Sequence, residues 1–193
     1  MPVPSAVRPR VGVVKFASCD GCQLQLLDLE DELLAVCEQF DIIEFAEAQT
    51  SRSNGPYDVL FVEGSVSAPE HIPRIAELRR EAKFLVTIGA CATAGGIQAL
   101  RNWGDHDAFR AAVYAHPEFV ASLATSTPIA AHVPVDAELR GCPIDAGQLV
   151  ELLTALLTGR RPQLRDEAVC MECKRNGNPC VMVARHTPCL GQV

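Results

Sequence analysis

Short apolar runs alternate with amphipathic stretches along most of this chain. The first run, Val11 to Phe16, is rich in β-branched residues and stops at a Ser-Cys-Asp-Gly cluster, which is typical of a buried parallel strand. Further runs predict strands over residues 42–46, 59–63, 84–88 and 129–134. The pattern therefore predicts a sheet of short strands.

Helical spacing separates several of these runs. After the first strand, apolar residues recur at steps of three and four, which is the signature of an amphipathic helix. They are Leu26, Leu29, Leu33, Val36, Cys37 and Phe40, and a second apolar stripe comprises Leu24, Leu27 and Leu34. A helix with two apolar faces is expected to pack against the sheet and against something else. Residues 72–82 and 145–157 also have the helical period, and Gly159 and Pro162 predict the end of the last helix.

The alternation of strands and helices predicts an α/β fold with a parallel sheet. We interpret residues 11–160 as a flavodoxin-like, doubly wound domain. Residues 1–10 hold three prolines and no apolar segment, so a flexible leader is expected there and not a secretory signal. Residues 161–193 hold four cysteines and little apolar surface, so this irregular tail needs something other than a hydrophobic core to hold it.

Composition narrows the range of functions. The chain has 193 residues, of which 48% are hydrophobic, and a formal net charge of −7. Nucleic-acid binding requires a concentrated basic face, so it is not expected. A membrane span is not expected either, because no run of 18 apolar residues is present. Nine cysteines, an odd number, disfavour a complete disulfide framework and favour metal or redox chemistry in the cytoplasm, where thiols stay reduced.

Four cysteines that are far apart in the sequence follow predicted strands. Cys19 and Cys22 follow the first strand, Cys91 follows the strand that ends at residue 88, and Cys142 lies in Gly-Cys-Pro after the fifth strand. Loops at the carboxyl ends of parallel strands meet at one edge of the sheet, so these thiols are expected to converge. Neighbouring glycines would bring backbone N–H groups close to sulfur, as an anionic iron-sulfur cluster requires.

Plainer interpretations of these residues stay open. Each thiol could be a small buried hydrophobic group. Cys19 and Cys22 alone, between a strand and a helix N-terminus, also match a thioredoxin-type dithiol, although Cys91 and Cys142 then have no role. Glu63, in Val-Glu-Gly-Ser at a strand end, is either a hydrogen-bonding or interface residue or a solvated turn carboxylate.

The tail holds a second set of four cysteines. They are Cys170, Cys173, Cys180 and Cys189. Four thiolates suit either zinc or an iron-sulfur cluster, and a proline directly before two of them favours the cluster. Cys37 is left over, and its place on the apolar stripe of the first helix assigns it to the core.

Five motifs occur in order along the chain. They are Cys-Asp-Gly-Cys-Gln-Leu-Gln-Leu-Leu-Asp at 19–28, Val-Glu-Gly-Ser at 62–65, Gly-Ala-Cys-Ala at 89–92, Gly-Cys-Pro at 141–143 and Cys-Met-Glu-Cys-Lys-Arg at 170–175. With them the chain resembles the small subunit of cytoplasmic nickel-iron hydrogenases, of the sulfhydrogenase delta and F420-non-reducing types. The 20 kDa subunit of respiratory complex I is a more distant resemblance, because it usually has adjacent cysteines where this chain has Cys-x-x-Cys.

The resemblance implies an electron-transfer subunit that has no hydrogen-activating site and no catalytic residue of its own. It implies that Cys19, Cys22, Cys91 and Cys142 hold a proximal 4Fe-4S cluster facing a nickel-iron large subunit. The tail cysteines would hold a second 4Fe-4S cluster. A flavin or iron-sulfur reductase subunit that serves NAD(P) or ferredoxin is the further partner implied.

Family members commonly continue past this point with cysteines for a third cluster. Here either the electron path is shorter, or a partner completes it, or the sequence is truncated. Three alternative functions are a standalone dithiol redox protein, a zinc-binding module and a complex I-like quinone reductase subunit.

Overall fold

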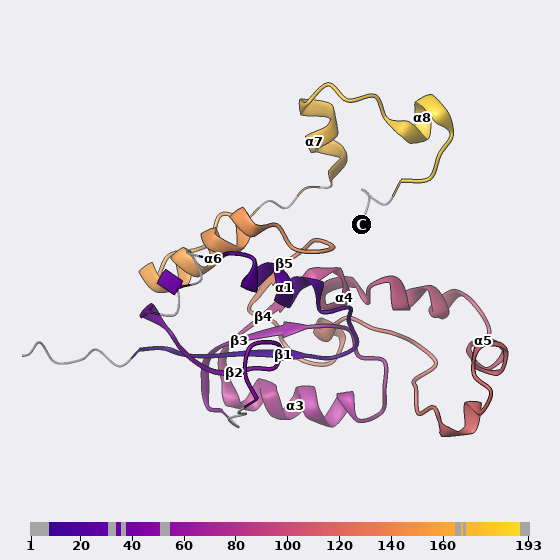
Figure 1. Cartoon of the computed structure of the whole chain (residues 1–193), viewed down its shortest axis with the longest axis horizontal. Coiled ribbons are helices and arrows are strands. Elements are labelled where there is room, and N and C mark those ends of the chain that lie inside the picture. The colour runs from indigo at the N-terminus through magenta and orange to yellow at the C-terminus, as the bar shows by residue number, and fades with distance from the viewer. Residues whose placement is uncertain are drawn as a thin grey trace, which may run out of the picture.

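A sheet of five parallel strands, in the order β2-β1-β3-β4-β5, forms the centre of the computed structural model (Figure 1). The strands are β1 (Arg10–Lys15), β2 (Asp41–Phe45), β3 (Tyr57–Glu63), β4 (Ala82–Ile88) and β5 (Ala137–Leu139). The structure describes residues 8–30, 34–35, 38–50, 55–164, 167 and 169–189. This strand order is the flavodoxin-like one, so the predicted doubly wound α/β fold is confirmed.

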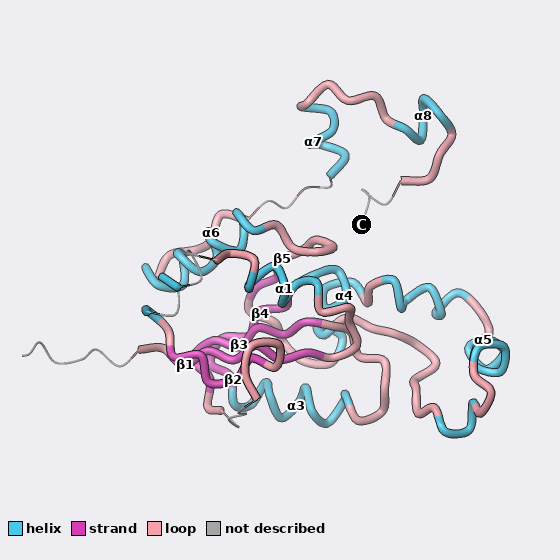
Figure 2. Tube along the Cα trace, viewed as in Figure 1, coloured by secondary structure: helices cyan, strands magenta, loops and turns pink. Residues whose placement is uncertain are grey.

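Helices cover both faces of this sheet (Figure 2). The α-helices are α1 (Gly21–Leu27), α3 (His71–Glu81), α4 (Gly89–Ala94), α5 (His106–Val113), α6 (Ala146–Thr158), α7 (Val169–Arg175) and α8 (Val181–Arg185). The short 3-10 helices are η1 (Ile97–Trp103), η2 (Pro117–Phe119) and η3 (Ile129–Ala131). Helices α1 and α6 lie over one face and α3 over the other, whereas α7 and α8 stand apart from the sheet. In the described part of the chain, no helix is both long and apolar enough to cross a membrane.

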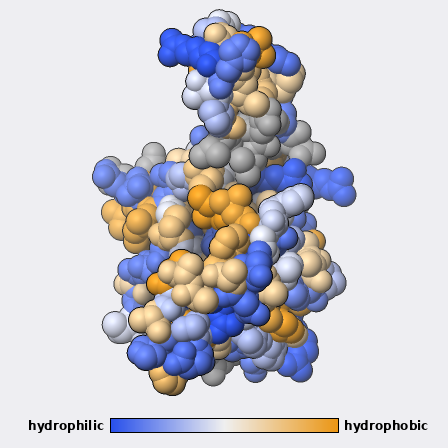
Figure 3. All heavy atoms as spheres, turned by 90° about the vertical axis from the view of Figure 1, so that its right-hand side faces the viewer, coloured by the Kyte–Doolittle hydropathy of each residue, from blue (hydrophilic) through white to orange (hydrophobic). Residues whose placement is uncertain are grey.

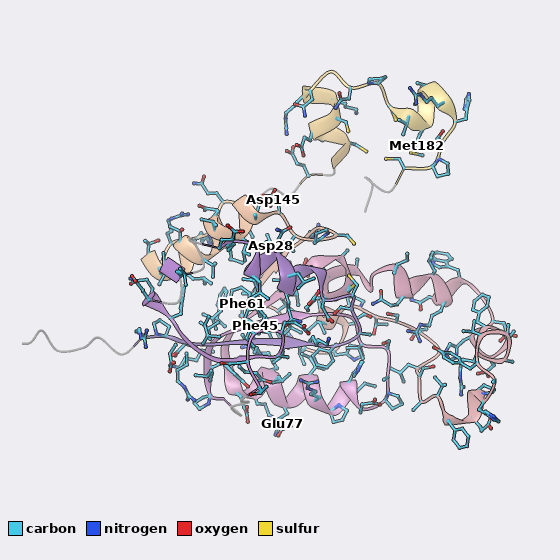
Figure 4. The ribbon with its side chains drawn as sticks, in the orientation of Figure 1. Asp28, Phe45, Phe61, Glu77, Asp145 and Met182 are labelled. Atoms are coloured by element: carbon cyan, nitrogen blue, oxygen red, sulfur yellow. The ribbon has the colours of Figure 1, made fainter. Side chains whose placement is uncertain are left out.

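Alternate residues of the strands supply two separate cores. Val13 and Phe61 pack on the side of α1 and α6, where Phe45 also lies (Figure 4). Val14 and Leu60, their neighbours in sequence, pack on the side of α3. Successive strand side chains point to opposite faces, so a parallel sheet covered on both faces needs the continuous apolar runs seen in β1 and β3.

The last helix of the domain begins and ends where its sequence predicts. The side chain of Asp145 accepts a hydrogen bond from the backbone N–H of Gln148 at 2.9 Å and caps the N-terminus of α6. Gly159 ends the helix in the left-handed region, with φ of 65°.

The predicted strand over residues 129–134 is wrong. Residues 129–131 form η3, and the fifth strand is instead the short β5. Ile129 and Val133 are buried, whereas the three residues between them are exposed. That spacing of four residues matches a helical turn, and a strand would have buried the alternate residue between them.

The first helix is shorter than predicted. Helix α1 ends at Leu27, and Glu30 adopts a left-handed φ of 47°, which interrupts the helical backbone. Helical backbone returns at residues 34–35 and 38–39. Cys37, which the sequence assigns to the core, lies outside the described residues. The tail also differs from the irregular segment expected, because it contains α7 and α8.

A buried pair of polar side chains stabilises the sheet on the face covered by α3. The hydroxyl of Tyr57 donates to Glu44 Oε2 at 2.5 Å, and both residues are buried. We expect Tyr57→Phe to lower the free energy of unfolding by about 1–3 kcal/mol, because it leaves a buried carboxylate without this donor. Urea unfolding measures the change. Tyr114→Phe, at a half-exposed side chain, is the control, and equal values for the two variants would contradict this prediction.

Candidate metal centre

The loops that carry four of the cysteines meet at the carboxyl edge of the sheet. Cys19 lies between β1 and α1, Cys22 lies in the first turn of α1, Cys91 lies in α4 directly after β4, and Cys142 follows β5. Cys91 interacts electrostatically with Cys142 and Cys19, and Cys22 interacts with Cys91. The structure therefore brings together the four thiols that the strand pattern predicted to converge.

Backbone hydrogen bonds join these strand-end loops to one another. The N–H of Ala90 donates to the carbonyl of Gly141 at 2.7 Å, which ties the loop after β4 to the loop after β5. Ala17, after β1, pairs with Ser65, after β3, through two backbone hydrogen bonds of 3.0 and 3.3 Å. Backbone hydrogen bonds thus join the strand-end loops in two pairs.

Glycines let the backbone approach the sulfur atoms. A Cβ on Gly89 would lie 2.4 Å from Cys22 Sγ, and a Cβ on Gly96 would lie 2.6 Å from Cys91 Sγ. Both glycines have positive φ. At these two glycines, backbone without side chains lies close to the sulfur atoms, as a thiolate-bound cluster needs.

The donor set at this edge consists of four thiols, and thiolates are the usual ligands of iron-sulfur clusters. In a 4Fe-4S cluster each of four thiolates binds a different iron, so its cysteines stand farther apart than those around one ion. Four converging thiols with glycine backbone against them fit that group.

The close approach of Gly89 to sulfur leads to a prediction about stability. We expect Gly89→Ala to destabilise the metal-free protein by about 1–3 kcal/mol more than Gly159→Ala, because its Cβ collides with sulfur. Gly159 has the same left-handed backbone but no atom within 4 Å of the position that a Cβ would take, so it isolates the collision from the cost of positive φ. Chemical denaturation of the two variants tests the difference. Equal destabilisation would show that Cys22 moves aside freely.

Glu63 connects β3 to the loop that carries the first two cysteines. Its side chain is 2% exposed and accepts hydrogen bonds from the backbone N–H of Cys22 at 3.1 Å and from Gln23 Nε2 at 2.9 Å. Of the two sequence interpretations, the hydrogen-bonding one is therefore confirmed and the solvated turn carboxylate is wrong. Because Glu63 holds the start of α1, it positions Cys22 at the sheet edge.

Two of the four thiols, those of Cys22 and Cys91, have a raised pKa. Burial raises the pKa of Cys22 to about 12, although a backbone hydrogen bond from Ile144 lowers it. Burial also raises the pKa of Cys91, against a lowering by the side chain of Gln98. A buried, protonated thiol is a weak nucleophile, so this environment does not activate Cys22 itself.

Gln98 is a contact of the site that the sequence did not indicate. Its side chain lies on η1, and its Nε2 is 3.6 Å from Cys91 Sγ and 2.7 Å from the carbonyl oxygen of Ala17. The sequence gives no sign of this contact, because one glutamine in a short segment forms no recognisable motif. Its partner Ala17 is also 81 positions away in the sequence.

The tail cysteines lie on and around the two short helices α7 and α8. Cys170 and Cys173 lie one turn apart on α7, Cys180 precedes α8, and Cys189 follows it. Cys170 and Cys173 are half-buried and the other two are exposed. Spacing of three residues on a helix places the first pair on the same face.

Apolar side chains remain exposed beside the cysteine edge. Leu24, two residues after Cys22, is 48% exposed, and Ile97, between Gly96 and Gln98, is 77% exposed. Further exposed apolar residues follow along η1, α5 and η2: Leu100, Trp103, Phe109, Val113, Tyr114 and Phe119. The view onto the end of the molecule where α5 lies shows apolar side chains gathered on it (Figure 3).

The second apolar stripe of the first helix is exposed only in part. Leu24 and Leu34 are exposed as predicted, whereas Leu27 is half-buried against the core between the sheet and α6. The stripe therefore offers fewer exposed apolar side chains to a partner than the sequence indicates.

A hollow of about 500 Å³ lies between the end of β1 and α5, and its walls include Phe16, His71 and Tyr114. The two arginines that line it hold the surrounding loops. Arg101 donates to the carbonyl of Leu123 at 3.2 Å, and Arg110 donates to the carbonyl of Pro117. Their guanidinium groups therefore act as structural donors within the segment that carries the exposed apolar residues.

Several known proteins with related sequences or folds are hydrogenase subunits. Sulfhydrogenase 2 subunit delta of Pyrococcus furiosus is 34% identical over 184 residues, which are 95% of this chain and 77% of the relative. A subunit of the F420-non-reducing hydrogenase vhu of Methanococcus voltae is 31% identical over 88% of this chain, and this chain spans 63% of the length of that relative. The crystal structure of NAD+-reducing nickel-iron hydrogenase in the H2-reduced state matches with a TM-score of 0.75 and 29% identity, over 82% of this chain and 96% of that chain.

A sequence family described as NADH ubiquinone oxidoreductase, 20 Kd subunit, matches residues 19–156. The parallel sheet and the cysteine edge both fall largely within that range, and the chain belongs to this family. Within the family its relatives are hydrogenase subunits, which are oxidoreductases, so the resemblance to the hydrogenase small subunit is confirmed together with the distant one to complex I.

Proposed function

We propose that this chain is the electron-transfer small subunit of a nickel-iron hydrogenase. It would carry electrons between the nickel-iron site of a large subunit and a partner linked to NAD(P) or ferredoxin. The convergence of four thiols at one edge of a parallel sheet, against glycine backbone, is the observation that supports this function most directly. The chain itself would not activate hydrogen.

Cys19, Cys22, Cys91 and Cys142 would hold the proximal 4Fe-4S cluster. When bound, such a cluster supplies reversible one-electron transfer. The protein's part is to orient the four thiolates and to set how much water and how many N–H dipoles surround them. Glu63 holds the N-terminus of α1, and the backbone of Ile144 donates toward Cys22.

Cys170, Cys173, Cys180 and Cys189 would hold a second 4Fe-4S cluster farther from the large subunit. The helical pairing of the first two thiols supports binding to a shared metal group, and the proline before each of the last two supports a shaped turn around sulfur. Zinc fits the same spacing. Metal analysis separates the two.

The large subunit would cover the edge that carries the first four cysteines. Exposed apolar side chains beside that edge, Leu24 and Ile97 among them, support a protein partner there. A flavin or iron-sulfur reductase subunit would receive the electrons at the tail. The cytoplasmic location that the cysteine content favours stays a prediction.

Iron and acid-labile sulfide analysis of anaerobically purified protein tests the proposed function. Two clusters correspond to about eight iron atoms per chain. Zinc in the tail with about four iron atoms per chain would support one cluster and a zinc module. Absence of iron from anaerobically purified protein would contradict the proposal and favour a standalone dithiol protein.

A further inference from the structure

The carboxamide of Gln98 lies between the sulfur of Cys91 and the loop after β1. Its Nε2 donates to the carbonyl oxygen of Ala17 at 2.7 Å. Nε2 and Oε1 of the same carboxamide are each 3.6 Å from Cys91 Sγ, within hydrogen-bonding range for sulfur. Gln98 is half-buried on η1, which follows the helix that carries Cys91.

The orientation of this carboxamide is determined by its neighbours. The carbonyl of Ala17 only accepts hydrogen bonds, so the nitrogen of Gln98 and not its oxygen must face it. A carboxamide nitrogen has two hydrogens, and the one that Ala17 does not use is free to point at Cys91. A cysteine that binds metal is a thiolate and can only accept, which matches this donor.

A glycine leaves the room that this arrangement needs. Gly96 has φ of +67°, and a Cβ there would lie 2.4 Å from Gln98 Oε1 and 2.6 Å from Cys91 Sγ. Any side chain at residue 96 would therefore push the carboxamide and the sulfur apart. The contact between Gln98 and Cys91 depends on backbone geometry at Gly96 and on the strand-end loop that holds Ala17.

We propose that Gln98 is a positioning residue that donates an N–H hydrogen bond to the Cys91 thiolate and so raises the reduction potential of the cluster that Cys91 holds. This inference rests on the proposed function. Reduction adds negative charge that is shared with the ligand sulfurs, and an N–H dipole aimed at sulfur stabilises the reduced form more than the oxidised form. Removal of the donor should therefore make the cluster harder to reduce.

The test compares Gln98→Met with the wild-type complex. Methionine keeps the length of the side chain but has no N–H donor. We expect full iron content and a more negative midpoint potential of the proximal cluster. The shift should be up to about 59 mV, which for one electron is a tenfold change in the ratio of oxidised to reduced cluster. Redox titration followed by electron paramagnetic resonance measures the shift, and the second cluster should keep its potential.

Gln163→Met is the matched control, because Gln163 is exposed and makes its contact to Glu151 through its backbone N–H at 2.8 Å. Gln98→Glu is the second variant, and its added negative charge should shift the potential further in the same direction. Unchanged potentials in iron-loaded Gln98 variants would overturn the proposal. Loss of iron from both would also overturn it, since it would make Gln98 necessary for binding the cluster and not for its potential. Lack of iron in the wild-type protein would instead contradict the proposed function.

Discussion

Cys91→Ala should lower the iron content from about eight to about four atoms per chain, because one ligand of the proximal 4Fe-4S cluster is lost. The half-buried thiol of Cys91 is the member of the first set for which the structure indicates interactions with the other three. Iron and sulfide analysis under anaerobic conditions measures the loss, and hydrogen oxidation by the assembled complex should be lost with it.

Two further variants make the result specific. Cys180→Ala should remove only the tail cluster, so its iron content should also fall to about four atoms per chain, with a different paramagnetic signal left behind. Cys37→Ala is the control, since the sequence assigns that residue to the core. It should keep all of its iron and lose on the order of 1 kcal/mol of stability. Full iron in Cys91→Ala would contradict the ligand set.

Leu24→Asp together with Ile97→Asp should abolish co-purification with the large subunit. Both side chains are exposed beside the cysteine edge, where a partner would bury them, at 48% and 77% exposure. Burial of carboxylates at an apolar contact costs several kcal/mol, so we expect binding to weaken by about 100-fold or more. Pull-down of the complex and its hydrogen oxidation rate measure the effect.

Ile72→Asp is the matched control for this interface. Ile72 is 42% exposed, but it lies on α3, on the opposite face of the sheet from α1. We expect this variant to bind the large subunit as the wild type does. A wild-type chain that is a stable monomer in air with both clusters intact would contradict the interface, because an uncovered cluster edge would then be tolerated.

The sequence predicted the parts of this fold that depend on local pattern. The apolar runs of β1, β3 and β4 identify strands buried on both faces, because each face of the sheet has its own core. The cap residue Asp145 and the left-handed Gly159 mark the ends of α6 through contacts only a few residues long. Convergence of the four cysteines also followed, because the ends of parallel strands share one edge.

Only the tertiary structure decided the features that depend on contacts between distant segments. Residues 129–134 have the apolar content of a strand, but the packing of Ile129 and Val133 into the core beneath α3 stabilises a turn there. The contact of Glu63 with the N–H of Cys22 spans 41 residues, and that of Gln98 with Ala17 spans 81. Sequence patterns report which surface an element buries, whereas the partner of a single polar side chain is determined by how the loops meet in space. The sequence therefore determined which thiols converge, and the tertiary structure determined which donors surround them.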